Sequence, residues 1–195
     1  MRSRCVCGNH LKCPFCIEPF FFPSLAKQAG EDRIIFLIDA RHAMFEKNRS
    51  GEVHIENCMK VALAVMKTKI IASEKSAVGV IFFGAKIKSD KTEGVHVLFP
   101  LESPTAKAIR ELHGLVEDMT LFNQKVGSSD AAHCPLRDAF SVCHGAFAAA
   151  SGTDRPHDFR RIWLFTNDDN PNADDSIELG AMVQVRTHLA SHLAP

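Results

Sequence analysis

The sequence predicts an α/β fold of three layers, in which a mostly parallel sheet lies between helices on both faces. Two long apolar runs, RIIFLID at 33–39 and AVGVIFFGA at 77–85, are typical of strands that are buried on both faces. Between them, apolar residues recur three or four positions apart, which is the spacing of one face of a helix. Strands that are separated by helices favour a mostly parallel sheet covered on both sides.

The first half of the chain is predicted to hold three strands and one helix. The strand at 33–39 leads into a polar loop at 46–52, and a helix near 53–72 follows, because its apolar residues recur at helical spacing. Strands at 77–85 and 95–101 come next, and both consist mostly of apolar residues.

The second half is predicted to alternate helices with one more strand. Ser103 and Pro104 are typical of a helix start, because proline is tolerated in the first helical turn. The predicted elements are a helix at 105–119, a helix at 135–151, a strand at 160–167 and a helix at 176–191. The whole arrangement is Rossmann-like, and ligands in such sheets bind beyond the carboxyl ends of the strands.

Composition and charge narrow the class of protein. The chain has 195 residues, of which 46% are hydrophobic, and this is enough for one domain with a substantial core. Its 23 basic and 23 acidic residues give a formal net charge of zero, whereas a stand-alone nucleic-acid-binding protein is usually clearly basic. No apolar run approaches the length that spans a bilayer, and the first residues lack the apolar core of a secretory signal. We therefore expect neither a membrane protein nor an independent nucleic-acid binder.

Residues 1–30 differ from the rest and are predicted to be a Cys-rich N-terminal extension of a domain at 31–195. Two pairs of thiols are suited to tetrahedral Zn²⁺, and they are Cys5, Cys7, Cys13 and Cys16. The gap between the pairs is short for a zinc finger, so the alternative is an extension with incidental thiols. The odd total of seven cysteines favours a reduced intracellular compartment. We expect no cofactor, with zinc at these thiols as the alternative.

Polar residues follow the first and the fourth predicted strands. Asp39 ends the first strand, and the run NDDN at 167–170 follows the fourth. Because the carboxyl ends of parallel strands meet at one edge of a sheet, we expect these side chains to lie close together. This edge is the candidate site.

Von Willebrand factor A domains resemble this pattern and place magnesium at this edge. The resemblance implies the motif Asp-x-Ser-x-Ser, but Arg41 and Ala43 occupy the two serine positions here. Mg²⁺ prefers octahedral oxygen ligands, and of the site only Asp39, Ser129 and Asp168 remain. We expect no bound metal, with Asp39 pairing with Arg41 or accepting backbone N–H groups. The alternative is a metal-dependent A domain that binds an acidic protein ligand.

Two segments resemble the amino-terminal domain of the seventy-kilodalton subunit of Ku heterodimers, which bind DNA ends in non-homologous end joining. The first, IIFLIDARHAMF at 34–45, contains the family's Asp-Ala-x-x-Ala-Met-Phe. The second, IWLFTNDDNP at 162–171, contains its Leu-Phe-Thr-Asn-acid-Asp-Asn-Pro. The resemblance covers about residues 27–190, and that family too lacks the magnesium motif.

The resemblance implies a von Willebrand A-like domain at 31–195 that is truncated at its C-terminus. The family's final strands, its DNA-encircling β-barrel and its SAP region do not follow. It also implies a nuclear, non-enzymatic interaction platform that acts in double-strand break repair and telomere maintenance. The implied partners are the larger Ku subunit, end-joining repair factors and double-stranded DNA ends, which are bound through regions outside this chain.

Two surfaces are candidate contact sites. The loop after the fourth strand is a candidate interaction loop, and it comprises Asn167, Asp168, Asp169, Asn170 and Pro171. Lysines outnumber acidic residues between positions 60 and 91, so phosphates of flanking DNA are possible ligands there, at Lys60, Lys67 and Lys69. The alternatives are a turn that caps the last helix and a solvated helix face.

Lys27 is a candidate catalytic residue. It lies shortly before the first strand, at the spacing where the Ku family has a lysine linked to Schiff-base lyase activity on abasic ends. Such chemistry needs a neutral amine, which burial or neighbouring positive charge produces. The surrounding SLAKQAGE contains no such crowding, so the alternative is a solvated lysine without this role.

Overall fold

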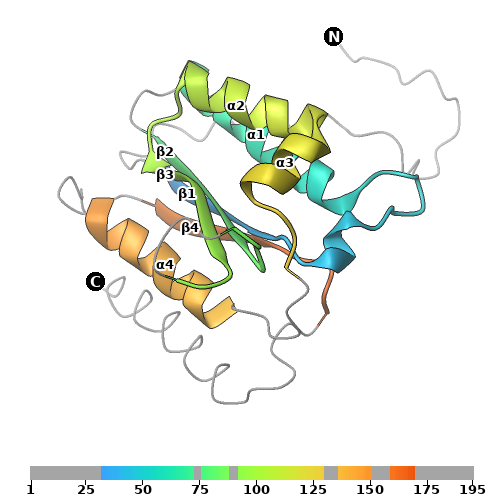
Figure 1. Ribbon diagram of the computed structural model, residues 1–195. Coiled ribbons are helices and arrows are strands. Elements are labelled where there is room, and N and C mark those ends of the chain that lie inside the picture. Colours follow the sequence, from blue (N-terminus) through green and yellow to red (C-terminus); the bar gives the residue numbers. More distant parts are fainter. Residues whose placement is uncertain (1–31, 73–75, 88–91, 130–135, 151–158, 170–195) are drawn as a thin grey trace, which may run out of the picture.

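Four strands form one sheet in the part of the chain that the structure describes. The computed structural model describes residues 32–72, 76–87, 92–129, 136–150 and 159–169 (Figure 1). The strand order is β3-β2-β1-β4, so β1 lies in the interior of the sheet and β4 at an edge. The strands are β1 (Asp32–Asp39), β2 (Ala77–Phe83), β3 (Val95–Glu102) and β4 (Phe159–Phe165).

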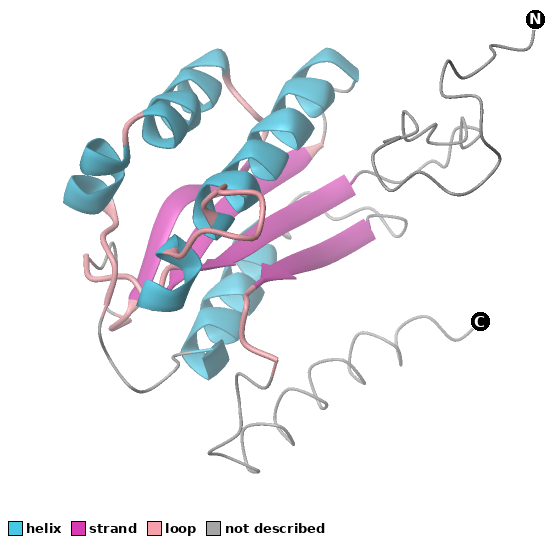
Figure 2. Cartoon of the chain, turned by 90° about the vertical axis from the view of Figure 1, so that its right-hand side faces the viewer, coloured by secondary structure: helices cyan, strands magenta, loops and turns pink. Residues whose placement is uncertain are grey.

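Helices cover both faces of this sheet. Figures 1 and 2 show α1, α2 and α3 on one face and α4 on the other. The helices are α1 (His54–Ala72), α2 (Ala106–Glu117), α3 (Met119–Lys125) and α4 (Leu136–Ala149), and the 3₁₀ helix η1 (His42–Phe45) follows β1. Among the described helices, none combines the length and hydropathy of a membrane-crossing segment. The predicted three-layer α/β fold is confirmed.

The sheet is mostly parallel, as the sequence predicts. β1 pairs in parallel with both β2 and β4, whereas β3 runs antiparallel to β2. Residues 84–94 join β2 to β3, and this segment is shorter than the dozen or more residues that a parallel crossover needs. The antiparallel pair therefore follows from the length of the connection.

The two edge strands differ in character. β3 carries Pro100, and its pairing with β2 shifts register on either side of Val80. Next to this irregularity, a β-carbon on Gly79 would lie 3.4 Å from the Cα atom of Leu101, so glycine lets the two backbones approach closely. Proline and register shifts discourage the addition of another strand. β4 carries no proline and pairs regularly with β1 over its whole length.

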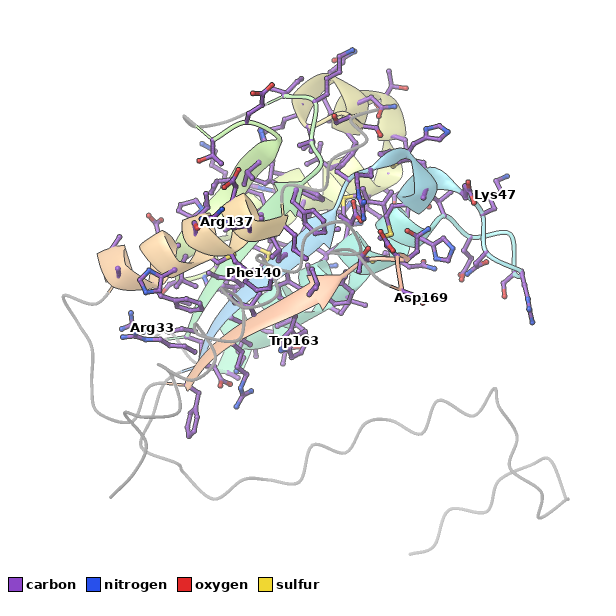
Figure 3. All side chains as sticks on the ribbon, turned by 90° about the horizontal axis from the view of Figure 1, so that it is seen from below. Arg33, Lys47, Arg137, Phe140, Trp163 and Asp169 are labelled. Atoms are coloured by element: carbon purple, nitrogen blue, oxygen red, sulfur yellow. The ribbon has the colours of Figure 1, made fainter. Side chains whose placement is uncertain are left out.

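The core consists of two apolar clusters, one on each face of β1. Phe36 and Ile38 point toward α1, and Ile35 and Leu37 point toward α4; all four are fully buried. Phe140 of α4 packs against the second cluster (Figure 3). A continuous apolar run in β1 is therefore the sequence signature of a strand that is covered on both faces.

The helix predicted at 105–119 is α2, and the short helix α3 that follows it was not predicted. Asp118 ends α2, and its carboxylate accepts hydrogen bonds from the backbone N–H groups of Thr120 and Leu121, so that it also begins α3. The cap of α2 is Thr105 and not Ser103, because the Thr105 hydroxyl accepts the N–H of Ala108. β2 and β4 each end two residues earlier than predicted. The predicted helix at 176–191 lies outside the described residues.

Candidate functional site

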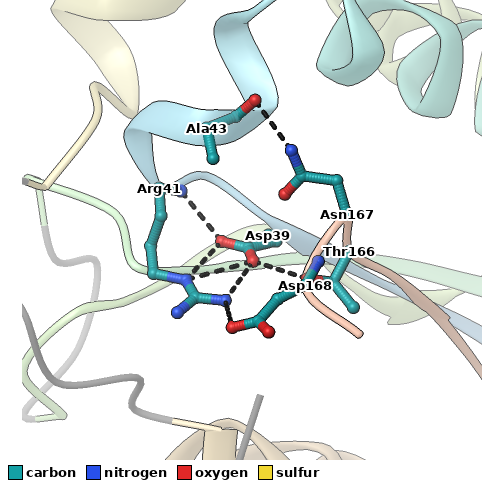
Figure 4. A network of polar contacts seen from close by, with 6 residues as sticks. All are labelled: Asp39, Arg41, Ala43, Thr166, Asn167 and Asp168. Atoms are coloured by element: carbon teal, nitrogen blue, oxygen red, sulfur yellow. Dashed lines mark hydrogen bonds and ion pairs between the residues drawn. The ribbon is translucent and has the colours of Figure 1, made fainter. Parts of the chain in front are cut away.

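The candidate site lies at the carboxyl ends of β1 and β4, where three short segments meet (Figure 4). Asp39 is the last residue of β1, Arg41 precedes η1, and Thr166 to Asp169 follow β4. The two strands are hydrogen-bonded neighbours, which brings residues more than 120 positions apart into contact. The predicted meeting of Asp39 with Asp168 at this edge is present.

The carboxylate of Asp39 is completely buried and is surrounded by donors. Oδ1 accepts the backbone N–H of Arg41 at 2.9 Å, and Nε of the same arginine lies 3.1 Å from each carboxylate oxygen. An Nη2 group of Arg41 reaches Oδ2 at 2.7 Å, and the hydroxyl of Thr166 donates to Oδ2 at 2.8 Å. A buried carboxylate is tolerated only when it is paired and hydrogen-bonded, and here both conditions are met.

Arg41 joins two carboxylates. Its Nη2 group also lies 3.2 Å from Oδ2 of Asp168, which is more exposed than Asp39. The backbone N–H of Asp168 donates to the Thr166 hydroxyl at 3.1 Å, so this hydroxyl links the two acids as well. We call Asp39, Arg41, Thr166 and Asp168 the Asp39 network.

Two further contacts fix the position of this network. The side-chain amide of Asn167 donates to the carbonyl oxygen of Ala43 at 2.9 Å, which ties the loop after β4 to η1. A β-carbon on Gly84 would lie 2.4 Å from Cγ of Arg41, so only glycine at the end of β2 leaves room for the arginine stem. The Gly84 carbonyl in turn accepts the backbone N–H of Ser129 at 2.9 Å.

The side chains of this site fit an internal ion pair better than a metal. Among the described residues, Asp39 and Asp168 are the carboxylates that contact Arg41, Ala43 offers no side-chain oxygen, and there is no group of three potential His, Cys, Asp or Glu ligands. Ser129 lies on the loop after α3 and not among the contacts of Asp39. The sequence left open whether Asp39 pairs with Arg41 or accepts backbone N–H groups, and the structure contains both contacts. Thr166 belongs to the motif at 162–171, but the sequence did not predict its contact with Asp39, because that contact depends on the pairing of β1 with β4.

The lysines proposed for DNA contact differ in their surroundings. Lys69 forms an ion pair with Asp32, which also lies 3.3 Å from Arg161, and Lys60 lies 3.8 Å from Glu56. Lys67 is exposed and has no ion pair with a described residue. Lys69 of α1 therefore pairs with an aspartate of β1 that also pairs with Arg161 of β4, and this contact joins the three elements.

Several predicted site residues lie outside the described residues, and their roles stay predictions. They are Cys5, Cys7, Cys13, Cys16, Lys27, Asn170 and Pro171.

Two described thiols are poor nucleophiles: Cys143 is buried in the core, and Cys58 is partly buried and packs against it. Burial raises the pKa of Cys58 to about 11, and the nearby charge of Asp39 adds to this effect. Burial raises the pKa of Cys143 to about 12. Because the thiolate is the reactive form, both groups are protonated and unreactive at neutral pH.

Comparisons with known proteins agree with the resemblance. The model of the family described as "Ku70/Ku80 N-terminal alpha/beta domain" matches residues 33–187. The "ATP-dependent DNA helicase ku70" of Dictyostelium discoideum is 36% identical over 156 residues, which are 75% of this chain and 17% of that protein. The "X-ray repair cross-complementing protein 6" of Mus musculus is 31% identical over 156 residues, 77% of this chain and 25% of that protein.

A further relative and one solved structure complete the comparison. The "ATP-dependent DNA helicase 2 subunit 1" of Rhipicephalus appendiculatus is 33% identical over 144 residues, 72% of this chain and 22% of that protein. The chain thus spans a quarter or less of the length of these relatives. The solved VWA domain of SpRpn10 has a TM-score of 0.45 and 14% identity, and the match covers 73% of this chain and 64% of that chain.

Proposed function

Because the chain belongs to the Ku70/Ku80 N-terminal alpha/beta domain family, we propose that it is a non-enzymatic interaction platform of a Ku-type protein that acts in DNA double-strand break repair. Its relatives include the X-ray repair cross-complementing protein 6 of the mouse, which supports a role in repair. The proposal includes non-homologous end joining and telomere maintenance as the processes, the nucleus as the place of action, and the larger Ku subunit and end-joining factors as partners. DNA ends would be bound by the parts of the relatives that this chain does not span.

The Asp39 network is the observation that carries the proposal of a platform. The edge of the sheet where A domains hold a ligand-binding cation contains the guanidinium of Arg41, which is held between Asp39 and Asp168. A fixed arginine offers no open coordination position, so binding here depends on surface contacts and not on a metal-bridged carboxylate.

The exposed residues at this edge are the proposed interaction loop. Asn167 and Asp169 are exposed. The Asn167 amide holds the loop to η1, and the Asp39 network holds it to β1 (Figure 4). A loop that is fixed from below loses little conformational entropy when a partner binds, which favours recognition.

Co-purification with the larger Ku subunit tests the proposal. The tagged chain and the larger subunit are co-expressed, and a full-length seventy-kilodalton relative is the positive control. We expect the chain to retain the larger subunit, and less of it than the full-length relative, because the chain spans a quarter or less of such proteins. No retention at low salt, with normal retention by the control, would contradict the proposal.

A charge reversal tests the interaction loop. Asp169→Lys is expected to reduce the retained larger subunit or repair factor at least tenfold, whereas Glu117→Lys is expected to change nothing. Both residues are exposed acids, but Glu117 ends α2 and does not belong to the loop. Equal retention by the two variants would remove the loop from the proposal.

A further inference from the structure

Helix α1 has an outer face that no other described element covers. Its six members are all exposed, and a rotation of about 100° per residue places them on one side of the helix. They are Lys60, Val61, Ala64, Lys67, Thr68 and Ile71. This outer α1 face points away from the sheet, because the buried residues of the helix, such as Met59 and Met66, lie on the opposite side.

Three of the six residues of the outer α1 face are apolar, namely Val61, Ala64 and Ile71. Val61 is 41% exposed and Ile71 is 86% exposed, with the small side chain of Ala64 between them. The hydroxyl of Thr68 donates to the Ala64 carbonyl at 2.9 Å. Its polar hydrogen is therefore used within the helix and is not free to bond a partner.

Helix α2, which packs beside α1 in the same layer, has a different outer face. Its exposed residues include Lys107, Arg110, His113 and Glu117, which is the usual composition of a helix surface that faces water. A helix that is apolar all round is typical of burial on all sides, and α1 has apolar residues both toward the core and away from it. Exposed apolar patches of this kind mark interaction sites.

The charges at the border of the outer α1 face are positive. Lys60 and Lys67 lie on one side of Ala64, one helical turn before and after it. Glu56 lies 3.8 Å from Lys60 and balances part of its charge, whereas Lys67 has no ion pair with a described residue. The face therefore combines an apolar strip with a positively charged border.

We infer that the outer α1 face binds an acidic amphipathic helix of a partner protein. Positions 60 to 71 span about three turns, or roughly 16 Å, which is the length of a short helix. The small residue Ala64 at the centre lets a second helix approach to the usual distance of about 8–10 Å. Apolar side chains of the partner pack on Val61 and Ile71, and its carboxylates pair with Lys60 and Lys67.

The size of the surface indicates a transient complex. A face of three helical turns buries much less area than the roughly 1,600 Å² of a stable protein–protein interface. The inference does not depend on the proposed function, since it concerns α1 and not the loop at 167–169. Failure of the peptide-binding test would therefore leave the proposed function untouched, and failure of the co-purification test would leave this inference untouched.

Designed peptides test the inference on the whole 195-residue chain, at a concentration at which it sediments as a monomer. One peptide is an 18-residue amphipathic helix with leucines at helical spacing and glutamates beside them; the other has lysines in place of the glutamates. We expect the acidic peptide to bind at least tenfold more tightly at low salt, and less so at high salt, because charge attraction is screened. Fluorescence anisotropy gives both dissociation constants.

Variants locate the binding surface. Ile71→Ser and Val61→Ser are each expected to weaken binding of the acidic peptide severalfold to tenfold, and Lys67→Glu is expected to remove the preference for it. Leu121→Ser is the matched control, because Leu121 on α3 is 43% exposed. All positions are exposed, so far-UV circular dichroism is expected to be unchanged.

Four outcomes would overturn the inference. They are equal binding of the two peptides, no binding of either, equal loss of binding in the Leu121→Ser control, and unchanged binding in both Ile71→Ser and Val61→Ser. Self-association that Ile71→Ser abolishes would assign the face to a second copy of the chain. Binding of duplex DNA that needs Lys67 but not Ile71 would assign it to nucleic acid.

Discussion

Arg41 supplies from within the chain the positive charge that neutralises Asp39. The side chain of Asp39 is 1% exposed and that of Arg41 is 19% exposed, so the pair lies in a region of low dielectric constant. Burial of such a pair adds little net stability compared with apolar residues, but removal of one partner leaves an unpaired buried charge. The presence of the pair therefore adds little to the free energy of unfolding, whereas the loss of one partner lowers it strongly.

Arg41→Ala is expected to lower the free energy of unfolding by about 3–5 kcal/mol, because Asp39 would stay buried without its partner. Denaturant unfolding followed by circular dichroism measures this change. Lys60→Ala is the control, since Lys60 belongs to an exposed ion pair worth about 0–1 kcal/mol. Equal effects of the two substitutions would show that the Asp39 network contributes no more to stability than an exposed ion pair.

Thr166→Val is expected to lower the free energy of unfolding by about 1–3 kcal/mol. The substitution keeps the side-chain volume but removes the donor to Asp39 and the acceptor of the Asp168 N–H. In the matched control Thr68→Val, the lost hydroxyl is exposed and bonds only within its own helix, so we expect a change near zero. A Thr166 variant as stable as the Thr68 variant would argue against the network.

His96 makes stability depend on pH. Burial lowers the pKa of this side chain from 6.5, although a hydrogen bond between its Nδ1 atom and the carbonyl of Ile87, at 2.9 Å, opposes the shift. Below the pKa that His96 has in the unfolded chain, the unfolded chain binds more protons than the folded chain. The contribution of neutral, buried His96 to stability is therefore present above pH 6.5 and is lost as the pH falls below this value. His96→Gln is expected to flatten this part of the stability curve between pH 7.5 and 5.5. An unchanged curve would contradict the assignment to His96.

At the scale of the element, β1 is fixed to its neighbours at both ends. Asp39 at its carboxyl end contacts Thr166 after β4, and Asp32 at its amino end contacts Arg161 of β4 and Lys69 of α1. Polar contacts at the two ends and apolar residues between them specify a single register of β1 against β4.

Among the described strands, β4 is the one most open to further pairing. No described strand pairs with its outer edge, it lacks the proline and the register shifts of β3, and Leu164 and Phe159 are 39% and 38% exposed. We therefore expect the chain to self-associate through β4 at high concentration, and Leu164→Lys to increase the monomer fraction. Analytical ultracentrifugation measures this, with Leu121→Lys on α3 as the control. A chain that is monomeric at all concentrations would contradict the expectation.

At the scale of the whole molecule, the two apolar clusters share the central strand. Phe36 of β1 packs edge-on to Trp163, with ring centroids 5.2 Å apart, and stacks on Phe165 at 6.0 Å. Both clusters contain residues of β1, and each described strand contributes side chains to at least one of them. The described elements are therefore expected to unfold together.

Trp163 reports on this cooperativity, because it is the single tryptophan of the chain. We expect its fluorescence and the far-UV circular dichroism to change at the same denaturant concentration. A fluorescence transition at lower denaturant would mean that β4 separates from the sheet before the rest unfolds.

The sequence by itself determined the fold class, the order of the elements and the edge of the sheet that carries the site. Apolar runs such as 34–38 can only be buried on both faces, and Asp39 at the end of such a run must lie at the carboxyl edge. The replacement of two serines by Arg41 and Ala43 indicated the ion pair as one of two alternatives for Asp39, because charge and side-chain oxygens are read directly from the sequence.

Only the tertiary structure decided which distant groups complete that edge. Thr166 donates a hydrogen bond to Asp39, Gly84 makes room for Arg41, and Asp32 pairs with Lys69, and the sequence predicted none of these three contacts. Helix α3 was missed for a related reason, since it is short and its start depends on the contacts of Asp118 with the backbone N–H groups of Thr120 and Leu121. Periodicity and charge are local properties, whereas hydrogen-bond partners depend on how the strands are ordered in the sheet.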